Sequence, residues 1–352
     1  MISKLKIIDA STVLAGPSVG MFFAELGAEV LKIENPNFPD VTRTWKLAQE
    51  QIENPISAYF SSINFGKKYQ SLDLKNANDH NKFIDLIKDA DILITNFKKG
   101  DDLKFNITDE ILKKVNPRLI HGKISGFGIN SDRVAYDLIL QAESGFMSMN
   151  GTPESGPIKM PIALIDVLAA HQLKEGILIA LLNRTATNLG GTVHVSLYDA
   201  AICSLVNQAS GYLMQNNIPQ RIGSLHPTIA PYGEIFTTAD NQQITFAIGS
   251  DTHFIKLCHF LGLEKLPEEE QFSTNQNRVI NRKELFEILQ DQLESFQSNF
   301  VLTWMHEHFV PCGKIRNLKE VFEDERAKSF IREETIDKIE TKRVSSIAFQ
   351  SW

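Results

Sequence analysis

The sequence predicts an α/β protein with a parallel-sheet domain first and a smaller α+β domain after it. Over the first half, short apolar strand-like runs alternate with amphipathic helix-like stretches, which is typical of parallel strands joined by right-handed crossovers. A segment punctuated by Pro and Gly interrupts this pattern at residues 217–233. An alternating, hairpin-like stretch and further helices follow it, which indicates a mixed α+β unit.

We assign residues 1–216 to the large domain. Its predicted strands are apolar runs, at residues 5–9, 30–33, 91–95, 119–124 and 192–196. Its predicted helices carry apolar residues at helical spacing. One predicted helix extends through residues 22–26, and two are centred on residues 83–87 and 111–115. Two longer helices are predicted at residues 167–182 and 198–214.

Residues 217–233 form the expected linker, and residues 234–322 the small α+β domain. Within it, residues 234–248 alternate like a hairpin with Asp240-Asn241 at the tip. Helices are predicted around residues 254–261 and 285–293. The last segment, residues 323–352, is charged and weakly patterned, and we predict no secondary structure for it.

Composition excludes several classes of function. The formal charge of −7 over 352 residues argues against a nucleic-acid partner. The three cysteines are far apart and fit neither a disulfide framework nor a zinc site, so we expect no metal. No apolar run approaches the ~18 residues of a membrane span, and Met1 leads directly into a strand-like segment. We therefore expect a cytoplasmic location and no membrane partner.

Several segments of the large domain are candidates for ligand binding. The turn at residues 13–18 follows a strand, but it lacks the glycines of a dinucleotide fingerprint and the Gly-Lys-Ser/Thr of a P-loop. A dehydrogenase or nucleotide hydrolase is therefore disfavoured. Cationic groups at residues 40–43, 64–68 and 96–100 lie near presumed strand edges, where they either bind an anion or form solvated faces.

Asp166 is the charged residue in an apolar run at 162–168. Two interpretations remain open: the carboxylate caps the following helix, or it is a nucleophile. A carboxylate with an ordinary pKa of about 3.9 is ionised at neutral pH and attacks a carbonyl without a general base. His171 lies slightly more than one helical turn further on and either orients Asp166 or is a structural histidine.

Taken together in chain order, these segments resemble class III coenzyme A-transferases, the family of formyl-CoA transferase, carnitine CoA-transferase and the 2-methylacyl-CoA racemases. The resemblance extends over nearly the whole chain. The matching segments are residues 13–17 (VLAGP), 26–34 (LGAEVLKIE), 40–43 (DVTR), 64–74 (NFGKKYQSLDL), 90–97 (ADILITNF), 116–120 (NPRLI), 125–128 (SGFG), 136–137 (YD), 141–145 (QAESG) and 226–233 (HPTIAPYG).

The resemblance implies a doubly wound large domain, a C-terminal segment that returns toward it, and an interlocked homodimer. It implies coenzyme A as substrate and product, with an acyl-CoA and a small carboxylic acid as partners. The family's nucleophile falls on Asp166, and its acidic neighbour on Asp137, where a carboxyl group could adjust Asp166 by hydrogen bonding. The implied CoA contacts fall on Ala15, Arg43, Leu72, Asn96, and Lys67 or Lys68, with Arg43 and the lysines meeting the phosphates.

Departures from the family pattern narrow the expected activity. The racemases use a His-Asp pair where this chain has Tyr136-Asp137, although their second acid has a counterpart in Asp251. Transferase is therefore preferred, with a racemase or a CoA-binding protein without catalysis as alternatives. Leu14 stands where formyl-CoA transferase has glutamine, and its glycine-rich loop is not found here. Both differences argue against formyl and oxalate substrates.

Overall fold

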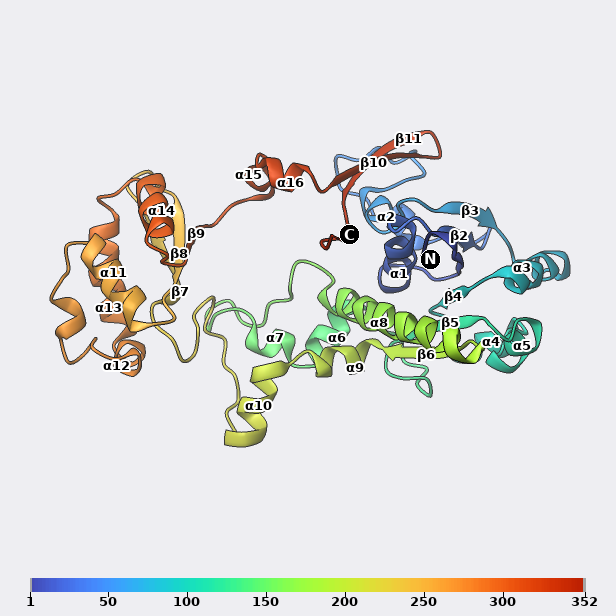
Figure 1. Cartoon of the computed structure of the whole chain (residues 1–352), viewed down its shortest axis with the longest axis horizontal. Helices are drawn as coiled ribbons and strands as arrows, with labels where there is room; N and C mark the ends of the chain where they lie inside the picture. The colour runs from blue at the N-terminus through green and yellow to red at the C-terminus, as the bar shows by residue number, and fades with distance from the viewer. Residues whose placement is uncertain (1, 351–352) are drawn as a thin grey trace. The chain divides into compact units, whose positions relative to one another are not determined.

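The computed structural model describes residues 2–350, which form two compact units. Unit 1 is the described part of Met1–Met147, Lys159–Pro219 and Ser329–Trp352. Unit 2 comprises Ser148–Ile158 and Gln220–Lys328. Residues 148–158 belong with unit 2, where the Gly223 N–H donates to the Gly151 carbonyl (2.8 Å). Each unit is described by itself below (Figure 1).

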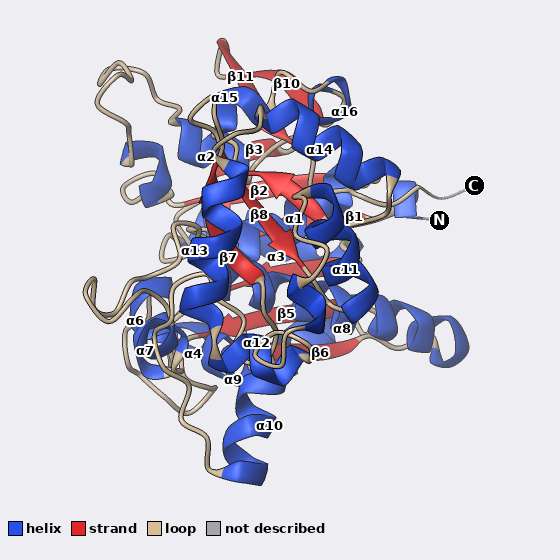
Figure 2. Ribbon diagram, turned by 90° about the vertical axis from the view of Figure 1, so that its left-hand side faces the viewer, coloured by secondary structure: helices blue, strands red, loops and turns tan. Residues whose placement is uncertain are grey.

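A six-stranded, fully parallel sheet forms the centre of unit 1, in the order β3-β2-β1-β4-β5-β6. Figure 2 shows β3, β2, β1, β5 and β6 in this order from top to bottom. The strands are β1 (Lys6–Asp9), β2 (Glu29–Glu34), β3 (Lys68–Ser71), β4 (Ile92–Thr95), β5 (Ile120–Ser125) and β6 (Gly191–Ser196). This α/β architecture confirms the predicted parallel sheet.

Helices cover both faces of this sheet because successive strand residues point to opposite sides. Ile7 packs in the core under α1 (Ala15–Glu25) and α8 (Leu164–Thr187). Its neighbour Ile8 packs in the opposite core, under α3 (Ala77–Asp89) and α5 (Asp109–Val115). Both cores are apolar and fully enclosed, as expected for a doubly wound sheet.

The predicted strands at 5–9, 30–33, 91–95, 119–124 and 192–196 correspond to β1, β2, β4, β5 and β6. The prediction of a single helix at 198–214 is wrong. This segment forms two helices, α9 (Leu197–Cys203) and α10 (Val206–Gln215). The break falls where Val206 has φ of +37° and the Ser204 hydroxyl donates to the Ala200 carbonyl (2.7 Å). Such side-chain bonding competes with the helical ladder.

Unit 2 contains a three-stranded antiparallel sheet of β7 (Tyr232–Thr237), β8 (Gln243–Ala247) and β9 (Cys312–Lys314). The predicted hairpin is β7–β8, and Asn241 at its tip has the positive φ (+56°) that such turns require. Helices cover one face through an apolar cluster that includes Phe236, Phe246 and Phe254. They are α11 (Asp251–Phe260), α12 (Asn275–Ile280), α13 (Arg282–Leu293) and α14 (Ser298–Glu307).

The C-terminal segment forms a hairpin on unit 1, although no structure was predicted for it. Strands β10 (Ile331–Ile336) and β11 (Ile339–Val344) pair antiparallel beside α2 (Ala58–Ser62) (Figure 1). Ile336 and Ile339 pack on Phe60, and the buried Arg343 pairs with Glu25 of α1. The hairpin therefore closes the end of the sheet that carries β2 and β3.

Short elements complete the described chain. They are the 3₁₀ turns η1 (Ile2–Lys4), η2 (Val41–Thr44) and η3 (Leu266–Glu268), and the helices α4 (Asp101–Lys104), α6 (Asp137–Glu143), α7 (Phe146–Met149), α15 (Leu318–Val321) and α16 (Glu325–Lys328). Within residues 2–350, no helix has both the length and the apolar character needed to cross a membrane.

Candidate active site

A cavity of about 320 Å³ lies where the strand order of unit 1 reverses. Strands β1 and β4 are neighbours there, with β2 and β3 extending on one side and β5 and β6 on the other. Ligand sites of open α/β sheets form outside the carboxyl ends of the strands at this position. The cavity walls come from the segments that follow β1, β4 and β5. The fold thus provides the crevice expected of a ligand-binding α/β protein.

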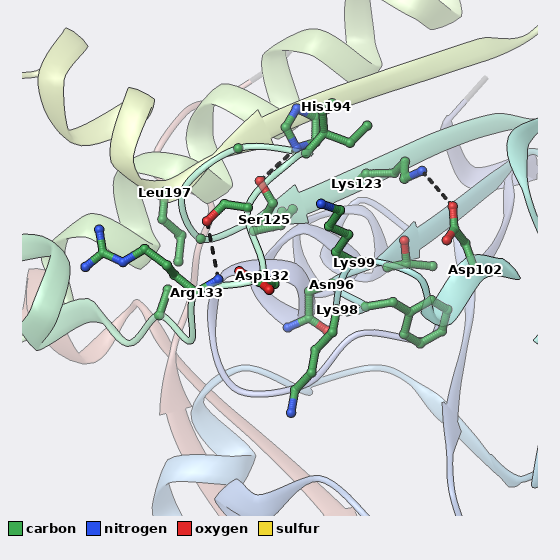
Figure 3. A pocket seen from close by; sticks show the side chains of 18 of the residues that line it. Asn96, Lys98, Lys99, Asp102, Lys123, Ser125, Asp132, Arg133, His194 and Leu197 are labelled. Atoms are coloured by element: carbon green, nitrogen blue, oxygen red, sulfur yellow. Dashed lines mark hydrogen bonds and ion pairs between the residues drawn. The ribbon is translucent and has the colours of Figure 1, made fainter. Parts of the chain in front are cut away.

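Cationic side chains surround this cavity (Figure 3). Lys98 and Lys99 follow β4, Lys123 lies on β5, and Arg133 lies in the loop after β5. Lys99 donates to a backbone carbonyl (2.9 Å), and Arg133 pairs with Glu143 (2.6 Å). Within the described chain, the side chain of Lys98 makes neither a hydrogen bond nor an ion pair. A cavity with this lining suits an anionic ligand.

A chain of hydrogen bonds fixes the polar wall of the cavity. His121 on β5 bonds the Thr95 hydroxyl through Nε2 (2.9 Å) and the Asp109 carboxylate through Nδ1 (2.6 Å). Ser125 bonds His194 on the neighbouring strand (2.8 Å). Burial lowers the pKa of His121, and its bond lowers the pKa of Asp109 to about 2. Both ring nitrogens of His121 are thus engaged, which fixes the orientation of the ring.

The turn between β1 and α1 lines the cavity in an unusual conformation. Val13 has φ of +71°, which a β-branched residue rarely adopts. The Thr12 N–H donates to Asn96 Oδ1 (3.0 Å), and Asn96 donates back to the Thr12 carbonyl (2.8 Å). The Val13 N–H donates to the buried carboxylate of Asp40 (3.3 Å). Asn96, expected to contact CoA, thus also holds the turn that leads to Ala15.

Lys67 lies in the interior, away from the cavity. Its side chain is fully buried, and its ammonium donates to Asp9 (2.7 Å), Asn64 (2.7 Å) and the Pro17 carbonyl (2.8 Å). An ammonium has three N–H groups, so none is left for a phosphate. Burial lowers the pKa of Lys67 to about 8. The expected phosphate contact is thus replaced by an anchor for the first turn of α1.

Arg43 is also engaged within the protein. Its guanidinium forms a two-point pair with Glu34 (3.0 and 2.7 Å) and approaches Asp337 at the tip of the C-terminal hairpin (3.4 Å). It stacks over Phe60 with 3.8 Å between guanidinium carbon and ring centroid. These contacts account for much of its donor capacity. A phosphate would have to compete with Glu34 and Asp337 for it.

The remaining expected CoA contacts are dispersed. Ala15 is the first residue of α1 and is buried beside the cavity turn. Leu72 follows β3 and is buried in the second apolar core, so it can offer a ligand only its backbone. Lys68 begins β3, at the amino end of the sheet, and pairs with Glu29 on the surface (2.7 Å). The structure does not bring Lys68 to the cavity.

Asp166 lies in the first turn of α8, with 7% of its surface exposed. Ala163 occupies the helix cap position, so the interpretation of Asp166 as a cap is wrong. Within residues 2–350, no hydrogen bond reaches its carboxylate. Burial, and secondly the charge of Asp137, raise its pKa to about 7. The sequence-based expectation of an ordinary, fully ionised carboxylate is therefore corrected, because with this pKa the group is only partly ionised at neutral pH. In its ionised form, a desolvated and unpartnered carboxylate has the properties of a nucleophile.

Asp137 begins α6 and acts on Asp166 through charge. Its Oδ1 accepts from the Ile165 N–H (2.7 Å), one of the unpaired donors at the start of α8. Its Oδ2 accepts from Gln141 (2.5 Å). It forms no direct bond to Asp166, which corrects the expected mechanism of adjustment. Tyr136, the residue before Asp137, lines the cavity, whereas Asp137 and Asp166 are not among its lining residues.

The sequence did not reveal an aromatic group beside these carboxylates. Burial raises the pKa of Tyr59 to about 12, and the charges of Asp166 and Asp137 add to this effect. The ring of Trp45 meets Tyr59 edge-on, with centroids 5.1 Å apart, and also contacts Tyr136 (6.5 Å). Tyr59 therefore presents a neutral hydroxyl near the pair. Its only signal in the sequence is one aromatic among many, which carries no chemical pattern.

Comparisons with known proteins show the family of the chain. Residues 2–350 match the CoA-transferase family III. The chain belongs to this family of enzymes. It is 34% identical to the succinate–glutarate CoA-transferase of Agrobacterium fabrum over 92% of this chain and 82% of that protein. It is 33% identical to the acetyl-CoA:oxalate CoA-transferase of Acetobacter aceti over 90% of this chain and 81% of that protein.

The family III fold is confirmed by a solved structure. A CaiB/BaiF family protein from Brucella suis superimposes with a TM-score of 0.84 at 32% identity, over 99% of this chain and 92% of that one. As a family III CoA-transferase, the chain uses CoA as a substrate. Among the described residues, no group of three or more His, Cys, Asp or Glu is arranged to hold a metal ion.

The structure also bears on the racemase alternative within family III. Asp251, the counterpart of the racemases' second acid, lies in unit 2 and pairs with Arg278 (2.6 Å). Arg278 is 1% exposed and bonds two backbone carbonyls, so the pair holds the fold of unit 2. Tyr136 stands in place of the racemase base. Asp251 is thus engaged in an ion pair, and position 136 carries no histidine.

Proposed function

We propose that this enzyme transfers CoA from an acyl-CoA to a short dicarboxylate through an anhydride on Asp166. The observation that carries the proposal is the buried carboxylate of Asp166, which accepts no hydrogen bond within residues 2–350 and feels the charge of Asp137. The dicarboxylate class rests on the relatives, whose names refer to succinate, glutarate and oxalate. Because one relative is named for oxalate, we include oxalate with succinate and glutarate among the acceptors to be compared in CoA-exchange assays.

The reaction follows from the chemistry of a carboxylate nucleophile. An Asp166 oxygen attacks the thioester carbonyl carbon, the carbon–sulfur bond breaks, and CoA leaves as a thiolate. The thiolate then attacks the Asp166 carbonyl of the mixed anhydride, which releases the first acid and leaves a thioester on Asp166. The acceptor carboxylate attacks this thioester, the carbon–sulfur bond breaks, and a second anhydride forms while CoA leaves again as a thiolate. Attack of the thiolate on the acceptor's acyl carbon gives the new acyl-CoA and regenerates Asp166.

The cavity supplies a second line of support. Lys98 and Lys99 are point charges suited to phosphates at the entrance of the crevice. We propose that they, and not Lys67, meet the phosphates of CoA. We also propose that the Tyr59 hydroxyl, which its raised pKa keeps neutral, donates a hydrogen bond to a substrate carboxylate or to the developing oxyanion.

Trapping tests the covalent step directly. The enzyme is incubated with succinyl-CoA, quenched with hydroxylamine, digested and analysed by mass spectrometry. We expect a hydroxamate on Asp166, and none in Asp166→Ala. Asp91→Asn, at the opposite end of the sheet, is the matched control and should be modified like the wild type. If the adduct maps to another residue, or none forms while CoA is exchanged, the proposed nucleophile is wrong.

Isotope transfer separates this function from its alternatives. With glutarate labelled with ¹⁸O in both carboxylates as acceptor, repeated turnover should carry the label to Asp166 and then to released succinate. A racemase would leave succinate unlabelled and would exchange the α-hydrogen of a CoA ester with solvent deuterium. A CoA-binding protein without catalysis would do neither.

We also propose that the enzyme acts as a homodimer. Helix α10 exposes Val206 (68%), Leu213 (78%) and Met214 (75%), and Leu182 of α8 is 69% exposed. Exposed large apolar residues, such as those on α10, are typical of a surface covered by another chain. Light scattering after size-exclusion chromatography should give twice the chain mass, and a monomer at micromolar concentration would contradict this.

A further inference from the structure

A buried charge network lies beneath the strained turn of the cavity. Lys32, on β2, is 0% exposed and pairs with Asp40 (3.0 Å) while donating to the Ser11 carbonyl (2.9 Å). Asp40 is 1% exposed. Taking two charges out of water is costly, so a pair of this kind needs compensating contacts. The contacts of Asp40 show where the compensation arises.

Asp40 joins two segments that are separate in the sequence. Its Oδ1 accepts from the Thr42 N–H (3.1 Å) and hydroxyl (2.8 Å), which caps the 3₁₀ turn η2. The same oxygen accepts from the Val13 N–H (3.3 Å). The carboxylate therefore bridges the turn before α1 to the turn that carries Arg43. Capping of η2 alone would need only a Ser or Asn at this position.

Val13 is the residue that needs an external tether. At φ of +71° its branched side chain crowds its own backbone, and glycine is the residue that adopts this conformation without cost. In a free chain Val13 would relax to negative φ. Val13 and Thr12 line the cavity, so relaxation would move its wall. The Asp40 carboxylate opposes this relaxation, with Lys32 fixing the carboxylate.

We propose that Asp40, fixed by Lys32, is a positioning residue that holds Val13 in the left-handed conformation and thereby shapes the cavity for CoA. This inference rests on the proposed function, because it takes CoA as the ligand of the cavity. In this proposal Asp40 takes no part in the chemistry on Asp166. Asp40 affects the affinity for CoA and not the reactivity of the nucleophile.

The test replaces the charges and then removes the strain. Lys32→Met with Asp40→Ser eliminates both buried charges together, and serine still caps η2. It leaves the Val13 N–H without its carboxylate. Titration calorimetry with free CoA should show affinity at least tenfold weaker than wild type. Adding Val13→Gly to this double variant should restore affinity to within about threefold, because glycine needs no tether.

A second ion pair gives the matched control. Asp91 and Arg184 pair at the amino end of the same sheet (2.8 Å). Asp91→Asn with Arg184→Met removes this pair far from the cavity and should leave CoA affinity at the wild-type value even if the thermal midpoint falls. The comparison separates a positioning effect from a loss of stability.

Each result decides the question. Wild-type affinity in the Lys32→Met, Asp40→Ser variant would overturn the inference, as would weak binding that Val13→Gly does not restore. If that variant fails to fold and Val13→Gly restores folding, the tether is supported. If neither the double variant nor the triple variant with Val13→Gly folds, the ion pair stabilises the fold independently of Val13, and the inference fails. If the wild type bound no CoA, the proposed function itself would fall, and this inference with it.

Discussion

Asp166→Asn should raise the stability of the protein in mildly alkaline solution while abolishing transfer. The pKa of Asp166 rises from 3.8 to about 7 on folding, mainly because its ionised form is buried. A carboxylate with a raised pKa stabilises the fold below pH 4 and loses that contribution as the pH rises through about 7. Asparagine carries no charge, so its contribution to the stability of the fold does not change over this pH range.

The size of this change in the free energy of unfolding follows from the difference between the pH and the pKa of Asp166 in the folded state. At roughly pH 5.5 the folded state lies about 1.5 pH units below that pKa, which corresponds to about 2 kcal/mol at 1.36 kcal/mol per unit. At roughly pH 8.5 this contribution is gone. The free energy of unfolding of Asp166→Asn, relative to wild type, should therefore increase by about 2 kcal/mol between the two conditions.

Urea unfolding followed by circular dichroism at both pH values measures this difference. Asp85→Asn, at an exposed ion pair on α3, is the control and should show no comparable change with pH. An unchanged difference between Asp166→Asn and wild type at the two pH values would refute the reasoning. So would a relative stability of the variant that falls as the pH rises, since that would mean that folding stabilises the charged form.

Asp137→Asn removes a charge that raises the pKa of the nucleophile, so the rise of kcat with pH should move to lower pH than in wild type. A stopped assay of CoA exchange from about pH 5 to 9 measures the midpoint. Gly16→Ala would place a Cβ atom 2.3 Å from the Ser11 hydroxyl oxygen and should cost about 1–3 kcal/mol in urea unfolding. Glu25→Ala leaves the buried Arg343 without its partner and should cost about 3–5 kcal/mol, with faster proteolysis of the C-terminal hairpin.

Elements with strong periodicity were predictable because burial dictates their pattern. The strands of the parallel sheet are enclosed on both faces and therefore appear as unbroken apolar runs, as at residues 92–94. Strand β3 was missed because its residues are polar and only partly buried at the edge of the sheet. Hairpin β10–β11 was missed because its residues are mostly charged, with few apolar ones between them. Its packing against α2 also depends on contacts between residues distant in the sequence.

The candidate site was predictable only in part. Asp166 and Asp137 could be located, but the way they interact could not, because the Ile165 N–H competes for Asp137 only once α6 and α8 pack together. The sequence shows which residues are cationic but not which of them are buried. Lys67 and Lys98 look alike in the sequence, yet one is sealed among three acceptors and the other lies open on the cavity.

The C-terminal hairpin has a consequence for synthesis on the ribosome. Its bonds join residues up to 321 positions apart, from Glu25 to Ser346, and unit 2 is encoded between the two partners. Unit 1 thus cannot be completed until nearly the entire chain has emerged. Until then, the aromatic surface around Phe60 remains uncovered. Nascent chains that stall within unit 2 should therefore expose this patch to chaperones and proteases, whereas released full-length chains should not.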